Sequence, residues 1–126
     1  MIGIACLVGY VGLLSFLSLN PWLRPSPAPM IGLLKWDLFE HTVAYGGLSI
    51  IIAVVLRHFG MGAWAALPGL GISSVVGILL EYGQLYLTSD RSFSVTDIYA
   101  NIFGALAGVF VYVVGWSKNY TPATRK

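Results

Sequence analysis

Charged residues are scarce in this chain, and their scarcity excludes an ordinary soluble protein. Only 10% of the 126 residues are Asp, Glu, Lys or Arg, whereas 57% are hydrophobic. Roughly a quarter of the residues of a soluble domain are charged, because its surface must be solvated. We therefore predict an all-α integral membrane protein, whose apolar surface faces lipid.

Cysteine and enzyme motifs are also scarce. Cys6 is the only cysteine, so no intrachain disulfide can form, and we expect it to be a small buried residue of an apolar helix. The chain has two histidines, no H-E-x-x-H pair and no nucleophile motif. We predict no metal and no cofactor. The basic stretch Lys118 to Lys126 fits anionic lipid better than nucleic acid, so no nucleic-acid partner is expected.

Four apolar stretches are long enough to cross a hydrocarbon core of about 30 Å, which takes about 20 helical residues. The first has no basic residue before it and no small-residue cleavage site after it, so we interpret it as a retained helix. Prolines predict an extended loop over 20–35, and turn formers predict another over 88–94. The chain is then one domain, 1–126, with a basic tail at 117–126 and a small bundle of transmembrane helices at 2–19, 36–56, 65–87 and 95–116.

Polar residues of the last three spans fall at one membrane level. In a chain that crosses four times, three helix ends lie on the same side of the membrane. They are the start of the second span, the end of the third and the start of the fourth. Glu81 and Gln84 lie near the end of the third span. At 100° per residue, Asp37, His41 and Tyr45 share one face of the second span, within about 80° of arc. We therefore expect one polar cluster.

The fourth span combines polar and small residues on one face. Asp97 and Asn101 lie in its first two turns, and Gly104 and Gly108 follow them within about 60° of arc. Two glycines four residues apart form a small-xxx-small seam at which helices approach closely. We predict that this face points inward and that Gly104 and Gly108 pack against another helix.

Basic residues near the span ends indicate the orientation. Four lie on the side of the termini and three on the other side, and the positive-inside rule then places both termini in the cytoplasm. The polar cluster would lie near the outer leaflet. The residues counted are Arg57, Lys118, Arg125 and Lys126 against Arg24, Lys35 and Arg91.

Five motifs in a fixed order resemble the VanZ-like family, and together they span nearly the whole chain. At Leu38 the family commonly has Lys, and Lys35 can substitute from upstream. The resemblance implies a small multi-pass protein of the bacterial cytoplasmic (inner) membrane, whose founding member is associated with teicoplanin resistance. The motifs are Ser18-Leu-Asn-Pro, Asp37-Leu-Phe-Glu-His41-Thr-Val-Ala-Tyr45-Gly-Gly-Leu48, Glu81-Tyr-Gly-Gln84, Arg91-Ser-Phe-Ser94-Val-Thr-Asp97 and Asn101-Ile-Phe-Gly104-Ala-Leu-Ala-Gly108.

Ionisable groups inside a membrane are functional candidates by default. We predict that the cluster binds a lipid-linked or cell-envelope head group, with Arg91 as the anion anchor. Membrane lipids are then the expected partners. The other expected ligand-binding residues are Asp37, Tyr45, Gln84 and Asn101.

Other uses of the cluster stay open. A hydrolase or transferase could use Glu81, Asp97 and His41 as acid and base. The same three residues have ligand types suited to a divalent ion, although a second histidine is missing. The polar residues could also be structural, with Asp97 as an N-terminal helix carboxylate. Finally, four helices without an extramembrane domain suit an accessory subunit of a larger membrane complex.

Overall fold

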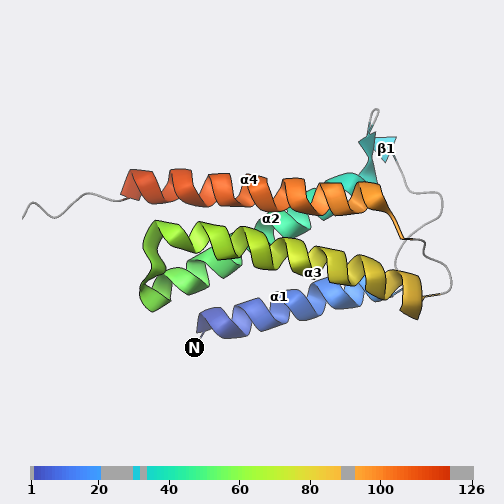
Figure 1. The fold of residues 1–126 in the computed structure, drawn as a ribbon, viewed down its shortest axis with the longest axis horizontal. Helices are drawn as coiled ribbons and strands as arrows, with labels where there is room; N and C mark the ends of the chain where they lie inside the picture. Colours follow the sequence, from blue (N-terminus) through green and yellow to red (C-terminus); the bar gives the residue numbers. More distant parts are fainter. Residues whose placement is uncertain (1, 21–29, 32–33, 89–92, 120–126) are drawn as a thin grey trace, which may run out of the picture.

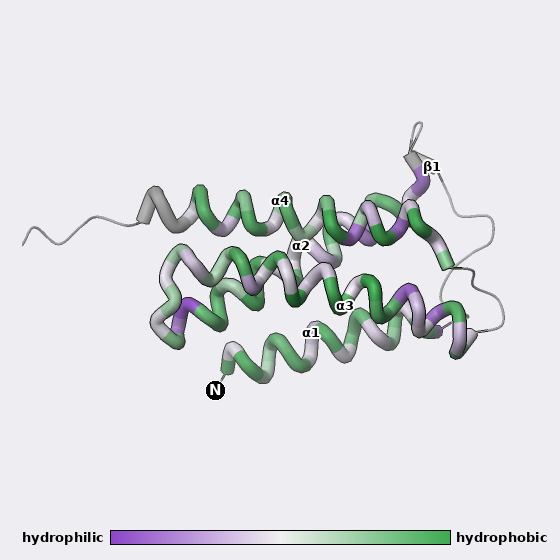
Figure 2. Tube along the Cα trace, viewed as in Figure 1, coloured by the Kyte–Doolittle hydropathy of each residue, from purple (hydrophilic) through white to green (hydrophobic). Residues whose placement is uncertain are grey.

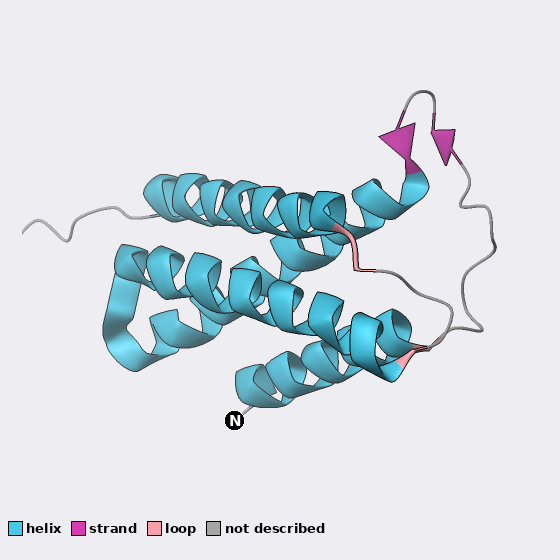
Figure 3. Ribbon diagram, turned by 45° about the vertical axis from the view of Figure 1, so that its right-hand side comes forward, coloured by secondary structure: helices cyan, strands magenta, loops and turns pink. Residues whose placement is uncertain are grey.

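The computed structural model describes residues 2–20, 30–31, 34–88 and 93–119, and this part of the chain is helical apart from one short β-ladder (Figure 1). β1 (Met30–Ile31) pairs antiparallel with β2 (Leu34–Lys35) just before the second helix (Figure 3). The all-α prediction is therefore confirmed as a class. The helices are α1 (Ile2–Leu19), α2 (Trp36–Leu56), α3 (Ala66–Leu87) and α4 (Val95–Asn119).

A glycine-containing turn joins α2 to α3. A π-helical turn, Arg57–Met61, and a 3-10 turn, Gly62–Ala65, follow the end of α2. Gly60 has a φ of 89° and Gly62 a φ of 55°, which side chains with a Cβ rarely adopt. The chain therefore reverses here, and α3 returns alongside α2 (Figure 1).

By length and apolar composition, three helical stretches in the described part of the chain can cross a membrane. They are Ile2–Leu19, Trp36–Leu87 and Val95–Gly115. The middle stretch of 52 residues contains α2, the turn and α3. The start of α1, the α2–α3 turn and the end of α4 lie at one end of the bundle (Figure 1).

α2 is the central helix, and its closest neighbour is α4. A Cβ on Gly104 would lie 2.2 Å from the carbonyl oxygen of Thr42, and one on Gly108 would lie 2.2 Å from that of Gly46. Only glycine permits such backbone contact. α4 thus approaches α2 through the two glycines of the seam that the sequence indicates.

α1 packs against α2 and α3 at the side of the bundle away from α4 (Figure 3). Only Leu14 and Ser18 of this helix are buried. Cys6 is exposed on it, so the expectation of a buried cysteine is wrong. An apolar helix in lipid does not need to bury its apolar side chains against protein, and composition alone therefore says little about burial.

Apolar core and polar cluster occupy different levels of the bundle. Leu48, Ile52 and Ala53 of α2 are at most 3% exposed and lie at the centre of the core. Most hydrophilic segments lie toward the end of the bundle near β1, and another lies near the α2–α3 turn at the opposite end (Figure 2). Six polar side chains are buried toward that end, each at most 9% exposed, namely Ser18, His41, Glu81, Gln84, Asp97 and Asn101.

Candidate functional site

His41 is the centre of the cluster. Its Nδ1 atom lies 2.7 Å from the Oδ1 atom of Asn101 on α4. Its Nε2 atom lies 3.7 Å from Oδ1 of Asp37 and 3.9 Å from Oδ2 of Asp97. Asp37 precedes His41 by one helical turn, so both side chains lie on one face of α2. One imidazole thus connects α2 with α4.

Asp97 is available to His41 because other groups cap α4. In the usual capping box, a carboxylate at this position accepts from the backbone N–H of the capping serine. Here Ser94 donates its backbone N–H to Oε2 of Glu81 on α3, at 3.3 Å, while the Asp97 backbone N–H donates to Ser94 Oγ, also at 3.3 Å. Glu81 therefore takes over the usual role of the Asp97 carboxylate.

Gln84 and Tyr45 lie beside this centre and make different contacts. Gln84 donates from Nε2 to Ser18 Oγ at 2.6 Å and so joins α3 to α1. The Tyr45 ring stacks on the His41 ring, with centroids 6.0 Å apart and planes 15° apart. The Tyr45 backbone carbonyl accepts from Ser73 Oγ at 2.8 Å. These contacts join α1, α2 and α3, and the contact between His41 and Asn101 adds α4.

The structure brings some of the sequence-predicted residues together and leaves others outside the centre of the site. Asp37, His41, Asp97 and Asn101 form the centre of the site, with Tyr45 against the imidazole. Glu81 is 1% exposed and accepts a hydrogen bond from the Ser94 N–H at the start of α4. The predicted anion anchor, Arg91, lies outside the described residues, as does Arg24. The side chain of Lys35, the possible substitute cation, is exposed.

Two serines of the family motifs also contribute to this level of the bundle. Ser94 caps α4, as its position in a turn just before the predicted fourth span indicates. Ser18 bonds to Gln84 on α3. The motif that begins at Ser18 did not reveal this contact, because a serine in an apolar helix usually bonds within its own helix.

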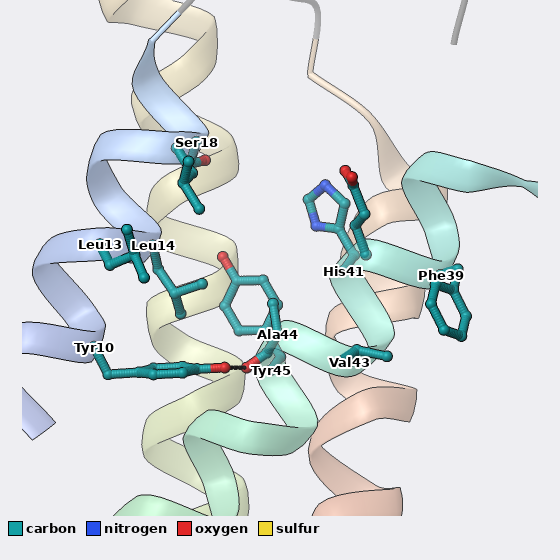
Figure 4. A pocket seen from close by; sticks show the side chains of 11 residues that line it. Tyr10, Leu13, Leu14, Ser18, Phe39, His41, Val43, Ala44 and Tyr45 are labelled. Carbon is teal, nitrogen blue, oxygen red and sulfur yellow. Dashed lines mark hydrogen bonds between the residues drawn. The ribbon is translucent and has the colours of Figure 1, made fainter. Parts of the chain in front are cut away.

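A groove between α1 and α2 leads to the site. Its volume is about 400 Å³. The rings of His41 and Tyr45 extend from α2 into the space between the two helices, and a hydrogen bond of 2.9 Å from Tyr10 OH to the Ala44 carbonyl bridges them at one end (Figure 4). The lining residues are Tyr10, Leu13, Leu14, Leu17, Ser18, Phe39, Glu40, His41, Val43, Ala44 and Tyr45.

Exposed apolar side chains form the rim of the groove. Leu13 and Leu17 on α1 are 53% and 42% exposed, and Val43 on α2 is 56% exposed. The polar wall near His41 includes Glu40, which accepts a hydrogen bond of 2.5 Å from Trp36 Nε1. The groove thus has an apolar rim and a polar end.

The chemistry of the cluster follows from its charges. Asp37 and Asp97 lie in the first turns of α2 and α4, and both carboxylates face the His41 imidazole. One imidazole and two carboxylates offer nitrogen and oxygen atoms to a cation. The cluster can therefore bind a positively charged group directly, or transfer a proton within hydrogen-bond reach of the groove.

Comparison with known proteins identifies the family. A comparison with curated proteins and one with solved structures found no match. The family model described as VanZ/LLP1 matches residues 7–116, which include every helix in whole or in large part. The chain is therefore a membrane protein that belongs to the VanZ/LLP1 family.

Proposed function

We propose that this chain is a multi-pass protein of the bacterial cytoplasmic membrane that binds an amphiphilic molecule. It crosses four times, with both termini in the cytoplasm and residues 1–126 acting as one membrane domain. The polar cluster lies near the outer leaflet and binds the head group of a membrane lipid or a lipid-linked cell-envelope intermediate. The common location of the α1 start, the α2–α3 turn and the α4 end supports the four crossings.

The observation that carries the proposal is the groove between α1 and α2. Its rim is apolar and exposed, so a hydrocarbon chain can enter from the side. His41 and Tyr45 are 6% and 3% exposed and line its inner wall. An amphiphile can place its chain along Leu13, Leu17 and Val43 while its head group reaches His41.

The head group would meet hydrogen-bonding groups at the polar end. Glu40, His41 and Ser18 line the groove there, and carboxylates of this kind bond to sugar hydroxyls or to amide N–H groups. Arg91 keeps its predicted role as the anion anchor. Asp37, Tyr45 and Asn101 hold the imidazole in position, and Gln84 fastens α1 at the mouth of the groove.

Filling the groove tests the proposal. Leu17→Trp and Val43→Trp place an indole in the groove, whereas Leu79→Trp places one on an exposed position of α3 outside it. We expect lipid identified by mass spectrometry to co-purify with the native chain and with Leu79→Trp. The two groove variants should retain at most about a tenth of it. Equal retention by all four proteins would exclude the groove as the binding site.

Two alternatives keep their own tests. A membrane-embedded hydrolase or transferase would use His41 and Asp97 as acid and base, with Glu81 supporting the start of α4. An accessory subunit would purify in gentle detergent only with a larger complex. Teicoplanin resistance is a property to test by expressing the chain in a susceptible host, with Leu17→Trp as the comparison.

A further inference from the structure

We infer that Asp37, His41 and Asp97 form a binding site for one divalent transition-metal ion. The candidate ligand atoms are one imidazole nitrogen and one oxygen from each carboxylate, and all lie within 4.8 Å of one another. The sequence argument against a metal was the lack of a second histidine. Asp37 supplies the third ligand instead, one helical turn before His41.

The separations fit an ion held between the three side chains. Nitrogen and oxygen ligands lie about 2.0–2.2 Å from Zn²⁺, so two ligands on opposite sides of one ion are at most about 4.4 Å apart. The two distances from His41 Nε2 to carboxylate oxygens, 3.7 and 3.9 Å, are within that limit.

His41 is oriented as a metal-binding histidine is. The 2.7 Å contact with Asn101 Oδ1 makes Nδ1 the donor, because an amide oxygen can only accept. Neutral imidazole then carries its lone pair on Nε2, which points at two carboxylates and makes no hydrogen bond within the described part of the chain. His41 is 6% exposed, and a metal-binding histidine commonly has this arrangement, with one ring nitrogen held by a partner and the other aimed at further ligands.

The negative charge of the two carboxylates favours binding of a cation. Asp37 and Asp97 have side chains that are 25% and 12% exposed, so water screens them incompletely. Carboxylate oxygens are ligands of negative charge, which attract a divalent cation. Mixed imidazole and carboxylate ligands suit Zn²⁺, Mn²⁺ or Fe²⁺. Three protein ligands also leave a coordination position open.

That open position gives the ion a role in the proposed function. A phosphate or carboxylate of a head group would be repelled by Asp37 and Asp97 alone, whereas a bound cation attracts it. The ion would bridge the anionic head group to the cluster beside the groove. This second step depends on the proposed lipid binding, but the cation site itself does not.

Metal binding by the purified, tag-free chain tests the site. After treatment with a chelator, titration with Zn²⁺ or Mn²⁺ should show one ion bound per chain. His41→Ala and Asp97→Asn should each weaken metal binding more than about 100-fold. Loss of a residue that only orients a ligand costs about 10–100-fold. His58→Ala, which removes the other histidine, should leave binding unchanged. No ion bound by the native chain, or equal binding by His41→Ala, would overturn the site.

A second variant covers the case in which a ligand substitution prevents folding. Asn101→Ala keeps all three ligands and removes the acceptor for Nδ1, and it should weaken binding about 10–100-fold. Bound Co²⁺ gives a visible spectrum that reports nitrogen and oxygen ligands. That spectrum should change in Asn101→Ala and stay unchanged in His58→Ala. An unchanged spectrum in Asn101→Ala would contradict the assignment of His41 as a ligand.

Lipid measurements separate the ion from the proposed function. If the native chain binds the ion in lipid-free detergent but retains no lipid, the cation site stands and the proposed lipid binding fails. If lipid stays bound after the chelator removes the ion, the bridging role is overturned and lipid binding stands. Loss of both on chelation, with recovery of lipid on addition of Zn²⁺, supports the bridge.

Discussion

His41 on α2 and Asn101 on α4 are joined by a 2.7 Å hydrogen bond between side chains that are 6% and 0% exposed. Sixty residues separate them in the chain. The bond fixes the plane of the imidazole and decides which nitrogen faces Asp37 and Asp97. The position of one amide therefore determines the chemistry available at the centre of the site.

Replacing Asn101 with Ala should destabilise the bundle. The imidazole loses its partner in a buried position, and hydrogen bonds between membrane helices contribute about 0.6 kcal/mol on average, with a maximum of about 1.7 kcal/mol. We expect a loss of roughly 1 kcal/mol in the free energy of unfolding, measured by denaturation in detergent micelles.

Ser15→Ala is the matched control for that measurement. The Ser15 hydroxyl bonds at 2.8 Å to the Val11 carbonyl of its own helix and to no other helix among the described contacts. Its removal should change stability by less than about 0.5 kcal/mol. Equal effects of the two substitutions would contradict a special role for the bond between His41 and Asn101.

Ser94→Ala should loosen the start of α4. It removes the oxygen that accepts from the Asp97 backbone N–H, and losing a cap of this kind costs about 1 kcal/mol. Ser94→Asn provides another capping oxygen and should restore stability. Hydrogen exchange at residues 95–98 measures the effect, and equal exchange in both variants would argue against capping.

Gly104→Ala should destabilise the contact between α2 and α4. The added Cβ would lie 2.2 Å from the Thr42 carbonyl oxygen, a backbone atom that cannot move away without shifting the helix. Overpacking of this kind costs about 1–3 kcal/mol. Gly71→Ala, with nothing within 4 Å of the new Cβ, should be neutral or stabilising. Comparable losses would show that helix propensity, rather than close packing, governs both positions.

α1 should separate more readily than the other helices. Hydrogen bonds from Tyr10 to Ala44 and from Gln84 to Ser18 attach it. The double variant Tyr10→Phe and Gln84→Leu removes both bonds. It should lower the free energy that holds α1 to the bundle by about 1.2 kcal/mol, which raises the population of molecules with α1 separated roughly tenfold. Mass-spectrometric hydrogen exchange should rise in residues 2–19 and stay constant in α4. A uniform rise in all helices would contradict independent opening of α1.

The proposed orientation of the chain in the membrane predicts which reporter proteins are active when fused at a given position. With both termini in the cytoplasm, green fluorescent protein fused after Lys126 should fluoresce, whereas alkaline phosphatase at the same position should be inactive. A fusion truncated after Thr88 should give the reverse pair of results. The opposite pattern would place the polar cluster at the inner leaflet and exclude an outer-leaflet head group.

The helices could be predicted closely because the bilayer imposes their length. An apolar run must be helical to satisfy its backbone in lipid, and it must be long enough to cross. The predicted bounds of α1 and α2 equal the observed ones, and α4 ends three residues later than expected, at Asn119 rather than Trp116. Burial was less predictable, as Cys6 shows, because lipid and protein are similarly apolar surroundings.

The sequence by itself also determined which residues share a face. Helical periodicity placed Asp37 with His41, and Asp97 with Asn101 and Gly104, because the angle per residue is constant. It could not decide which faces meet. Two contacts depend on how the helices rotate and slide against one another. One is the pairing of His41 with Asn101, and the other is the hydrogen bond from the Ser94 N–H to Glu81.

Those rotations are set by packing in three dimensions. Close contact of Gly104 with Thr42 fixes the register of α4 on α2, and that register places Asn101 and Asp97 beside His41. The spacing of residues along one helix is a local property that the sequence determined. Distances between side chains on different helices depend on the whole bundle, so only the tertiary structure decided that Asp37, His41 and Asp97 form one cluster.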